Sequence, residues 1–175
     1  MGKLSASPTV SAAADADYIV ILAGGLNKLI TALNLRKNSY RARAFGSAGS
    51  TAMTANVYMK VPINTTSFDP NSNFSTSNNR YTIPVTGCYQ INAVARVDNT
   101  TDQALAQVSI YKNGVQYATG GTHMSSGTSG QIRCVYADML ELTAGDYIEV
   151  WALSTGTANL FPNSSYISVA LVAPS

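Results

Sequence analysis

Residues 81–97 read Tyr-Thr-Ile-Pro-Val-Thr-Gly-Cys-Tyr-Gln-Ile-Asn-Ala-Val-Ala-Arg-Val, a turn signal followed by an alternating run. Within 88–97 two sets of side chains alternate, an apolar set and a more polar one. The apolar set is Tyr89, Ile91, Ala93, Ala95 and Val97, and the other is Cys88, Gln90, Asn92 and Arg96. Successive side chains of a strand point to opposite faces, so this stretch predicts a strand with one face in a core.

The same pattern recurs over the rest of the chain after residue 43. Residues 146–153 and 165–172 alternate in the same way, and Tyr111-Lys-Asn-Gly-Val115 is typical of a two-residue hairpin. Turn signals separate the runs at short spacing, and no fixed-period repeat is present. We therefore expect a mainly β chain, with residues 44–175 forming an antiparallel jelly-roll sandwich as a head domain.

Residues 1–43 have a different character. Residues 1–12 are small and polar, typical of an arm, and the next apolar residues are spaced by three and four. They are Ile19, Leu22, Leu26, Leu29 and Leu33. This spacing predicts a helix over 13–37 whose stripe forms a short stalk and trimer seam. The alternative is an amphipathic helix folded back on its own domain.

Composition narrows the classes of function. Of the 175 residues 46% are apolar and only 11% are charged, with a net charge of +2. Residues 1–50 carry +4 and the remainder −2, a weak basis for nucleic-acid binding. The longest early apolar run, residues 18–23, is far shorter than the roughly 20 residues that span a bilayer. We expect neither a nucleic-acid partner nor membrane insertion.

The candidate chemical groups are sparse. The single histidine, His123, lies in a glycine- and serine-rich stretch without a nucleophile pattern, so we expect no catalytic residue. Asp98 and Asp102 could hold Ca²⁺, but we favour an acidic connecting loop and expect no metal site or cofactor. Cys88 falls on the polar face of its strand and Cys134 on an apolar one, so we expect two reduced thiols.

Several predicted strands are apolar on both faces. Four bulky aromatics fall on what should be outer faces: Tyr111, Tyr147, Trp151 and Tyr166. A monomeric sandwich would expose them as a large patch, so we expect these rings to contact neighbouring copies.

The stretch Tyr81-Thr-Ile-Pro-Val-Thr-Gly-Cys-Tyr-Gln-Ile91 also resembles a known motif. It is similar to the aromatic-x-x-Pro-x-x-Gly-x-Tyr-x-hydrophobic segment of the globular heads of complement's first component and their tumour-necrosis-factor-like relatives. Further segments follow that family's order: Phe68-Asp69 with Phe74, residues 108–114, residues 140–150 and residues 165–171.

This resemblance implies a jelly roll that associates as a parallel homotrimer behind a stalk, with Gly87 in a tight turn and Tyr89 in the core. No Gly-x-y collagen run is present, so the helix over 13–37 would replace that stalk. Heads of this kind that have a short helical stalk and a composition rich in Asn, Ser, Thr and Gly look like bacteriophage virion proteins. This resemblance leads to our functional expectation. We expect a non-enzymatic structural protein on the virion surface, anchored to another virion protein through residues 1–43, as capsid decoration or tail fibre. The alternative is a receptor-binding module for a host surface glycan or protein.

Overall fold

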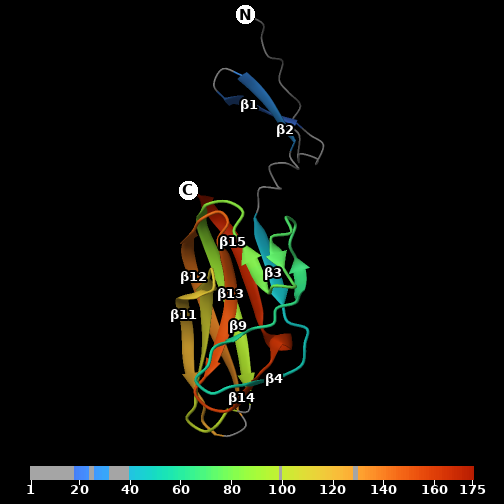
Figure 1. The fold of residues 1–175 in the computed structure, drawn as a ribbon. Helices are drawn as coiled ribbons and strands as arrows, with labels where there is room; N and C mark the ends of the chain where they lie inside the picture. The colour runs from blue at the N-terminus through green and yellow to red at the C-terminus, as the bar shows by residue number, and fades with distance from the viewer. Residues whose placement is uncertain (1–17, 24–25, 32–39, 99, 128–129) are drawn as a thin grey trace, which may run out of the picture. The chain divides into compact units, whose positions relative to one another are not determined.

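A computed structural model describes residues 18–23, 26–31, 40–98, 100–127 and 130–175 (Figure 1). Contacts divide the chain into two units, Met1–Ser39 and Tyr40–Ser175, which are described separately below. The second unit is the head, and its first strand begins at Arg41, ahead of the expected boundary after residue 43. No helix in the described ranges has the length and apolar character needed to cross a membrane.

The first unit contains a strand pair where the sequence predicted a helix. β1 (Tyr18–Ala23) and β2 (Leu26–Thr31) are antiparallel, with Ala23 opposite Leu26 and Tyr18 opposite Thr31. The predicted helix over 13–37 is therefore wrong for these residues. Ile19, Leu22, Leu26 and Leu29 lie in the strands, and Leu33 lies outside the described residues.

Local chemistry accounts for the error. Three β-branched residues stand in succession at 19–21, and such residues favour strands over helices. A Gly-Gly pair separates two apolar runs in the sequence, which is also a hairpin signal. Because nearly every position of this run is apolar, some of its residues are spaced by three and four even when the chain forms strands. The spacing is therefore no evidence for a helix here.

The head is a sandwich of two antiparallel sheets. The first, here called the β10 sheet, has the order β11-β10-β13-β8-β7, with β5 also paired to β13. Its strands are β5 (Met59–Lys60), β7 (Phe74–Ser75), β8 (Arg80–Thr82), β10 (Leu105–Lys112), β11 (Val115–Met124) and β13 (Tyr147–Ser154).

The second sheet, the β9 sheet, has the order β4-β14-β9-β15-β3-β6, with β12 also paired to β9. Its strands are β3 (Arg41–Phe45), β4 (Thr51–Met53), β6 (Thr65–Phe68), β9 (Gly87–Asp98), β12 (Gln131–Leu142), β14 (Ala158–Leu160) and β15 (Tyr166–Pro174). A short 3-10 turn, η1 (Pro162–Ser164), precedes β15.

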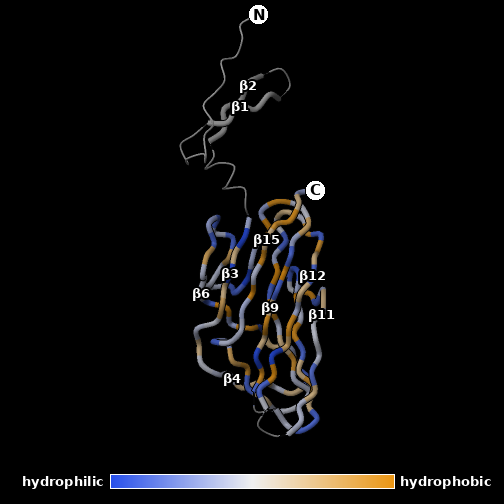
Figure 2. The backbone as a smooth tube through the Cα atoms, turned by 180° about the vertical axis from the view of Figure 1, so that it is seen from behind, coloured by the Kyte–Doolittle hydropathy of each residue, from blue (hydrophilic) through white to orange (hydrophobic). Residues whose placement is uncertain are grey.

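The core lies between the sheets and confirms the alternation in the sequence. Tyr89, Ile91, Ala93, Ala95 and Val97 of β9 are all fully buried. From the opposite sheet, Ile110, Ile148 and Val150 join the same core. Hydrophobic and hydrophilic stretches accordingly alternate along the strands in Figure 2.

Two details of the motif at 81–91 are visible. Tyr89 reaches the core as expected, and its hydroxyl donates to the Val85 carbonyl at 2.6 Å. Gly87 is required for a different reason from the one expected: a Cβ there would collide with the Ala173 carbonyl and lie 2.9 Å from Pro174 Cα. The glycine therefore allows β15 to approach the start of β9 closely.

Candidate interaction surfaces

The candidate catalytic and metal residues do not assemble into a site. His123 is exposed near the end of strand β11 and stands opposite Ala106 of β10. Ser125 Oγ donates to the Gly127 carbonyl at 2.8 Å. Within the described ranges, no three His, Cys, Asp or Glu residues gather as metal ligands.

The two aspartates considered for calcium have separate roles. Asp98 is buried beside Arg96, whose Nε donates to Oδ1 at 2.9 Å and whose Nη2 donates to Oδ2. The Arg96 guanidinium also lies 4.6 Å from the centre of the Phe161 ring. Asp102 Oδ1 accepts the Gly127 backbone N–H at 2.7 Å. The Asp98 carboxylate therefore pairs with Arg96 of its own strand, whereas the Asp102 carboxylate holds the Gly127 backbone.

Both cysteines are unpaired. Cys134 is fully buried on the core face of β12, as predicted, whereas Cys88 is half-buried on the outward face of β9. In the pairing of β9 with β12, Cys88 stands opposite Glu141 and Cys134 stands opposite Ala95. These two pairs are seven residues apart along the strands. At about 3.3 Å per residue this separation exceeds the reach of a disulfide.

The outward face of the β10 sheet carries an aromatic cluster. The Tyr111 and Trp151 rings stack with centroids 4.5 Å apart, and Tyr58 meets Tyr111 edge-on at 5.7 Å. Tyr147 lies under the Arg80 guanidinium, 4.3 Å from ring centre to Cζ. These outer-face rings thus make contacts within one chain, and their contact with neighbouring copies stays a prediction.

Polar groups hold the cluster in place. Glu149 is only 6% exposed, and it accepts Lys60 Nζ at 2.6 Å and Trp151 Nε1 at 3.0 Å. The Tyr58 hydroxyl donates to Gln107 Oε1 and accepts Gln116 Nε2 at 3.0 Å. Burial and the neighbouring Tyr58 raise the pKa of Tyr111, so its phenol stays neutral at physiological pH.

The outward face of the β9 sheet has a different composition. It is built by β12, β9, β15 and β3, whose registers place residues in rows across the sheet. One row is Val135, Val94, Tyr166 and Phe45; the next is Ala137, Asn92, Ser168 and Arg43; the third is Met139, Gln90, Ala170 and Arg41. We call these residues the association face.

The association face is apolar or uncharged except at its β3 edge. Val135 and Met139 expose 51% and 56% of their surface although they are large hydrophobic residues. Arg41 and Arg43 lie on β3, while Glu141 lies opposite Cys88 at the β12 side. Arg43 also stacks on Tyr166 at 5.0 Å, so Tyr166 belongs to this face and not to the aromatic cluster.

Sequence reasoning assigned only Tyr166 of this face to a subunit contact. It classified Gln90 and Asn92 simply as the polar side of a strand. One feature of the sequence could have indicated a contact surface. The side of the strand that carries Gln90 and Asn92 is polar but almost uncharged, in a chain that is only 11% charged.

Comparison with known proteins identifies the fold. No family model matches the chain, and no curated protein does. Among solved structures, the globular domain of zebrafish complement 1qA superposes with a TM-score of 0.58 at 12% identity, covering 79% of this chain and all of that one (100%). Eiger TNF from S. frugiperda gives 0.56 at 16% identity, covering 78% and 94%. Murine APRIL gives 0.54 at 15% identity, covering 77% and 100%. The head therefore has the jelly-roll fold shared by complement 1q and tumour-necrosis-factor-like domains.

Proposed function

We propose that this protein is a non-enzymatic head that self-associates as a homotrimer through the association face. The observation that carries the proposal is the continuous uncharged surface on β12, β9 and β15, with Val135 and Met139 exposed at one side. Exposed hydrophobic groups next to one another on a soluble domain are characteristic of interaction sites.

Charge at the two edges supports a cyclic arrangement. Arg41 lies exposed on β3, beside the edge strand β6, and Glu141 lies exposed on β12, the edge strand on the other side. In a head-to-tail ring, one edge of each copy meets the other edge of its neighbour. A contact between Arg41 of one copy and Glu141 of the next would favour this arrangement over one in which two β3 strands meet.

The biological setting that we propose is the surface of a bacteriophage virion. Residues 1–43 would attach the trimer to another virion protein, since residues 1–50 carry a net charge of +4 and would favour an acidic docking surface. The head would then face outward, as capsid decoration or as part of a fibre.

A second candidate is a receptor-binding module. The aromatic cluster favours it, because Tyr58, Tyr111 and Trp151 are partly exposed and held by polar contacts on a sheet. Aromatic rings with nearby amides suit a host glycan or protein. Binding to host surface material that is lost on Trp151→Ala, with the head still folded, would favour this candidate.

The oligomeric state tests the main proposal. Light scattering of the full chain should give a mass three times that of one 18.4 kDa chain. Val135→Asp buries an unpaired charge in the contact and should shift the protein to monomer. Val115→Asp is the matched control, since Val115 is 69% exposed in the other sheet, and it should leave the trimer intact. A stable monomer for the unmodified chain, or equal effects of both variants, would contradict the proposal.

A further inference from the structure

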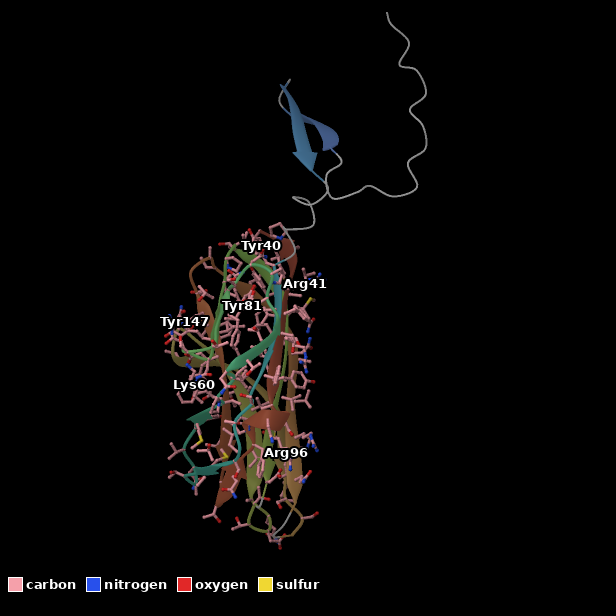
Figure 3. The ribbon with its side chains drawn as sticks, turned by 90° about the vertical axis from the view of Figure 1, so that its right-hand side faces the viewer. Tyr40, Arg41, Lys60, Tyr81, Arg96 and Tyr147 are labelled. Carbon is pink, nitrogen blue, oxygen red and sulfur yellow. The ribbon has the colours of Figure 1, made fainter. Side chains whose placement is uncertain are left out.

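The outward face of the β10 sheet combines aromatic rings with a column of amides and hydroxyls. The registers of β11, β10 and β13 place outward residues in three rows: Gln116, Tyr111 and Glu149; Thr119, Ser109 and Trp151; and Thr122, Gln107 and Leu153. We call these residues, together with Tyr58 and Lys60, the polar–aromatic face. Figure 3 shows Lys60 on one side of the head and Arg41 on the other, so this face points away from the association face.

Two irregularities in the pairing of β10 with β11 shape this face. The register shifts between Gln107 and Ser109, and it shifts again between Ile110 and Tyr111. Bulges of this kind re-aim side chains, and they are frequent next to functional sites. Here they leave only amide and hydroxyl side chains on the β11 side of the three rows.

A hydrogen-bond network orients these polar groups. The Tyr58 hydroxyl donates to Gln107 Oε1, and Gln107 Nε2 donates to Thr122 Oγ1 at 2.6 Å. Gln116 Nε2 donates to the Tyr58 hydroxyl at 3.0 Å and to Thr119 Oγ1 at 3.1 Å. Among the described side chains, this network ends in the Thr122 hydroxyl hydrogen and the Gln116 amide oxygen. The face thus offers both a donor and an acceptor on exposed residues.

The ionised groups of this face neutralise each other. Glu149 is only 6% exposed, and it accepts Lys60 Nζ at 2.6 Å. Its other oxygen accepts Trp151 Nε1 at 3.0 Å, which holds the indole ring in place. A phosphate group favours several donors with positive charge, whereas a metal cation requires several acceptors. A face without net charge that offers donors and acceptors together suits neither of these ligands.

The aromatic rings supply the apolar part of the face. Tyr111 and Trp151 are stacked on each other and both are partly exposed. The faces of aromatic rings carry partial negative charge, which attracts weakly positive C–H groups. A sugar ring presents C–H groups on its faces and hydroxyl groups around its rim. Each of these hydroxyls can both donate and accept a hydrogen bond, which matches the polar groups beside the rings.

We propose that the polar–aromatic face binds a neutral oligosaccharide. One sugar ring would lie against Trp151, and the rims of neighbouring sugars would bond to Gln116 and Thr122. These two residues pair with Tyr111 and Gln107, which are four residues apart on β10. This separation corresponds to about 13 Å along the strand, more than the width of a single sugar ring. The ligand is therefore an oligosaccharide and not a monosaccharide.

This inference rests on the second candidate function, receptor binding, and it specifies the ligand as an uncharged glycan. Binding by one copy is weak, because the face is open and makes few polar contacts. The association face lies on the other sheet and stays available for contact between subunits. In a trimer, several copies engaging one glycan surface would raise the overall affinity through avidity.

Fluorescence of the full chain tests the site directly, because Trp151 is the only tryptophan. The neutral probes are tetrasaccharides of glucose, mannose, galactose and N-acetylglucosamine. At least one should change the Trp151 emission saturably, and its monosaccharide should bind about tenfold more weakly or worse, since it reaches fewer groups. Matched charged probes are tetragalacturonate and deacetylated chitosan tetramer, which should bind more weakly than their neutral equivalents. No saturable change with any neutral probe, or equal binding of the charged ones, would overturn the proposal.

Tyr58→Phe keeps the aromatic ring but removes the hydroxyl that joins Gln107 to Gln116. It should weaken saccharide binding about fivefold, the loss typical of one hydrogen bond, while the head stays folded. Tyr117→Phe is the matched control, since Tyr117 is 47% exposed and its ring contacts Lys112 instead. Equal binding by the two variants would contradict the assigned site.

A protein receptor gives a different result from a glycan. Host surface material would then bind in a Trp151-dependent way although no saccharide probe does, which would overturn the ligand class but not the receptor-binding candidate. Loss of both kinds of binding would remove that candidate altogether. The mass from light scattering is measured separately, so neither result affects the proposed homotrimer.

Discussion

Cys134 illustrates what complete burial does to a single reactive group. Burial raises the pKa of its thiol from 9.0 to about 12, although a backbone hydrogen bond from His123 offsets part of the increase. Since only the thiolate is a strong nucleophile, Cys134 is inert in the folded protein at physiological pH. Cys88, half-buried on the outward face of β9, is the more accessible thiol.

The stability of the head should therefore fall at alkaline pH. An unfolded Cys134 loses its proton near pH 9.0, while the folded one keeps it to about pH 12. Between these values the unfolded state binds fewer protons, so the free energy of unfolding declines with rising pH by about 1.4 kcal/mol per pH unit for this group. Tyr136, whose pKa burial raises from 10.0 to about 12, adds to the decline above pH 10.0.

Urea unfolding at a series of pH values between about 8 and 11 measures this slope. Cys134→Ala should flatten the part of the curve between pH 9.0 and 10.0, below the pKa at which Tyr136 begins to contribute. Cys88→Ala is the control and should leave the slope nearly unchanged. Equal slopes in all three proteins would show that Cys134 ionises as easily folded as unfolded.

At the level of elements, the β10–β11 hairpin depends on two positive φ angles. Lys112 pairs with Val115 across Asn113, with a φ of 53°, and Gly114, with a φ of 80°. This confirms the hairpin predicted from residues 111–115. Asn113 also fixes the neighbouring strand, since its Nδ2 donates to Asp146 Oδ1 at 2.7 Å and its Oδ1 accepts the Tyr147 N–H at 2.9 Å.

Gly114→Ala should destabilise the head by about 1 kcal/mol, because any Cβ is strained at this φ. The nearest atom to a Cβ there is the Tyr147 hydroxyl at 3.4 Å, so steric contact adds little. Gly49→Ala is a suitable control, since its φ is not positive and a Cβ there meets nothing within 4 Å. Chemical unfolding that gives the same midpoint for both variants would contradict the argument.

The elements also show what sequence could and could not reveal. The long strands were predictable because one face is buried, and alternation records burial directly. The helix over 13–37 was a wrong prediction, since an almost continuous apolar run has no clear period. The association face could not be located from sequence, because its rows combine residues from four strands that are distant in the chain.

At the scale of the molecule, the head is a compact unit that begins at Tyr40. Its sandwich and its association face both lie within residues 40–175. β3 is integral to it: Ala42 and Ala44 are buried in the core, and residues 41–45 pair with residues 166–170 of β15.

A chain of residues 40–175 should therefore fold and associate like the full chain, whereas a chain of residues 46–175 should not. Loss of β3 would uncover the edge of β15, expose core positions and remove Arg41 and Arg43 from the association face. An unpaired strand edge next to exposed core invites aggregation. Circular dichroism with thermal unfolding and light scattering distinguishes the two. Cooperative unfolding of the 46–175 chain near the full-length midpoint would show that β3 is dispensable. A monomeric but stable 40–175 chain would instead show that association depends on residues 1–39, and would move the subunit contact from the head to the N-terminal unit.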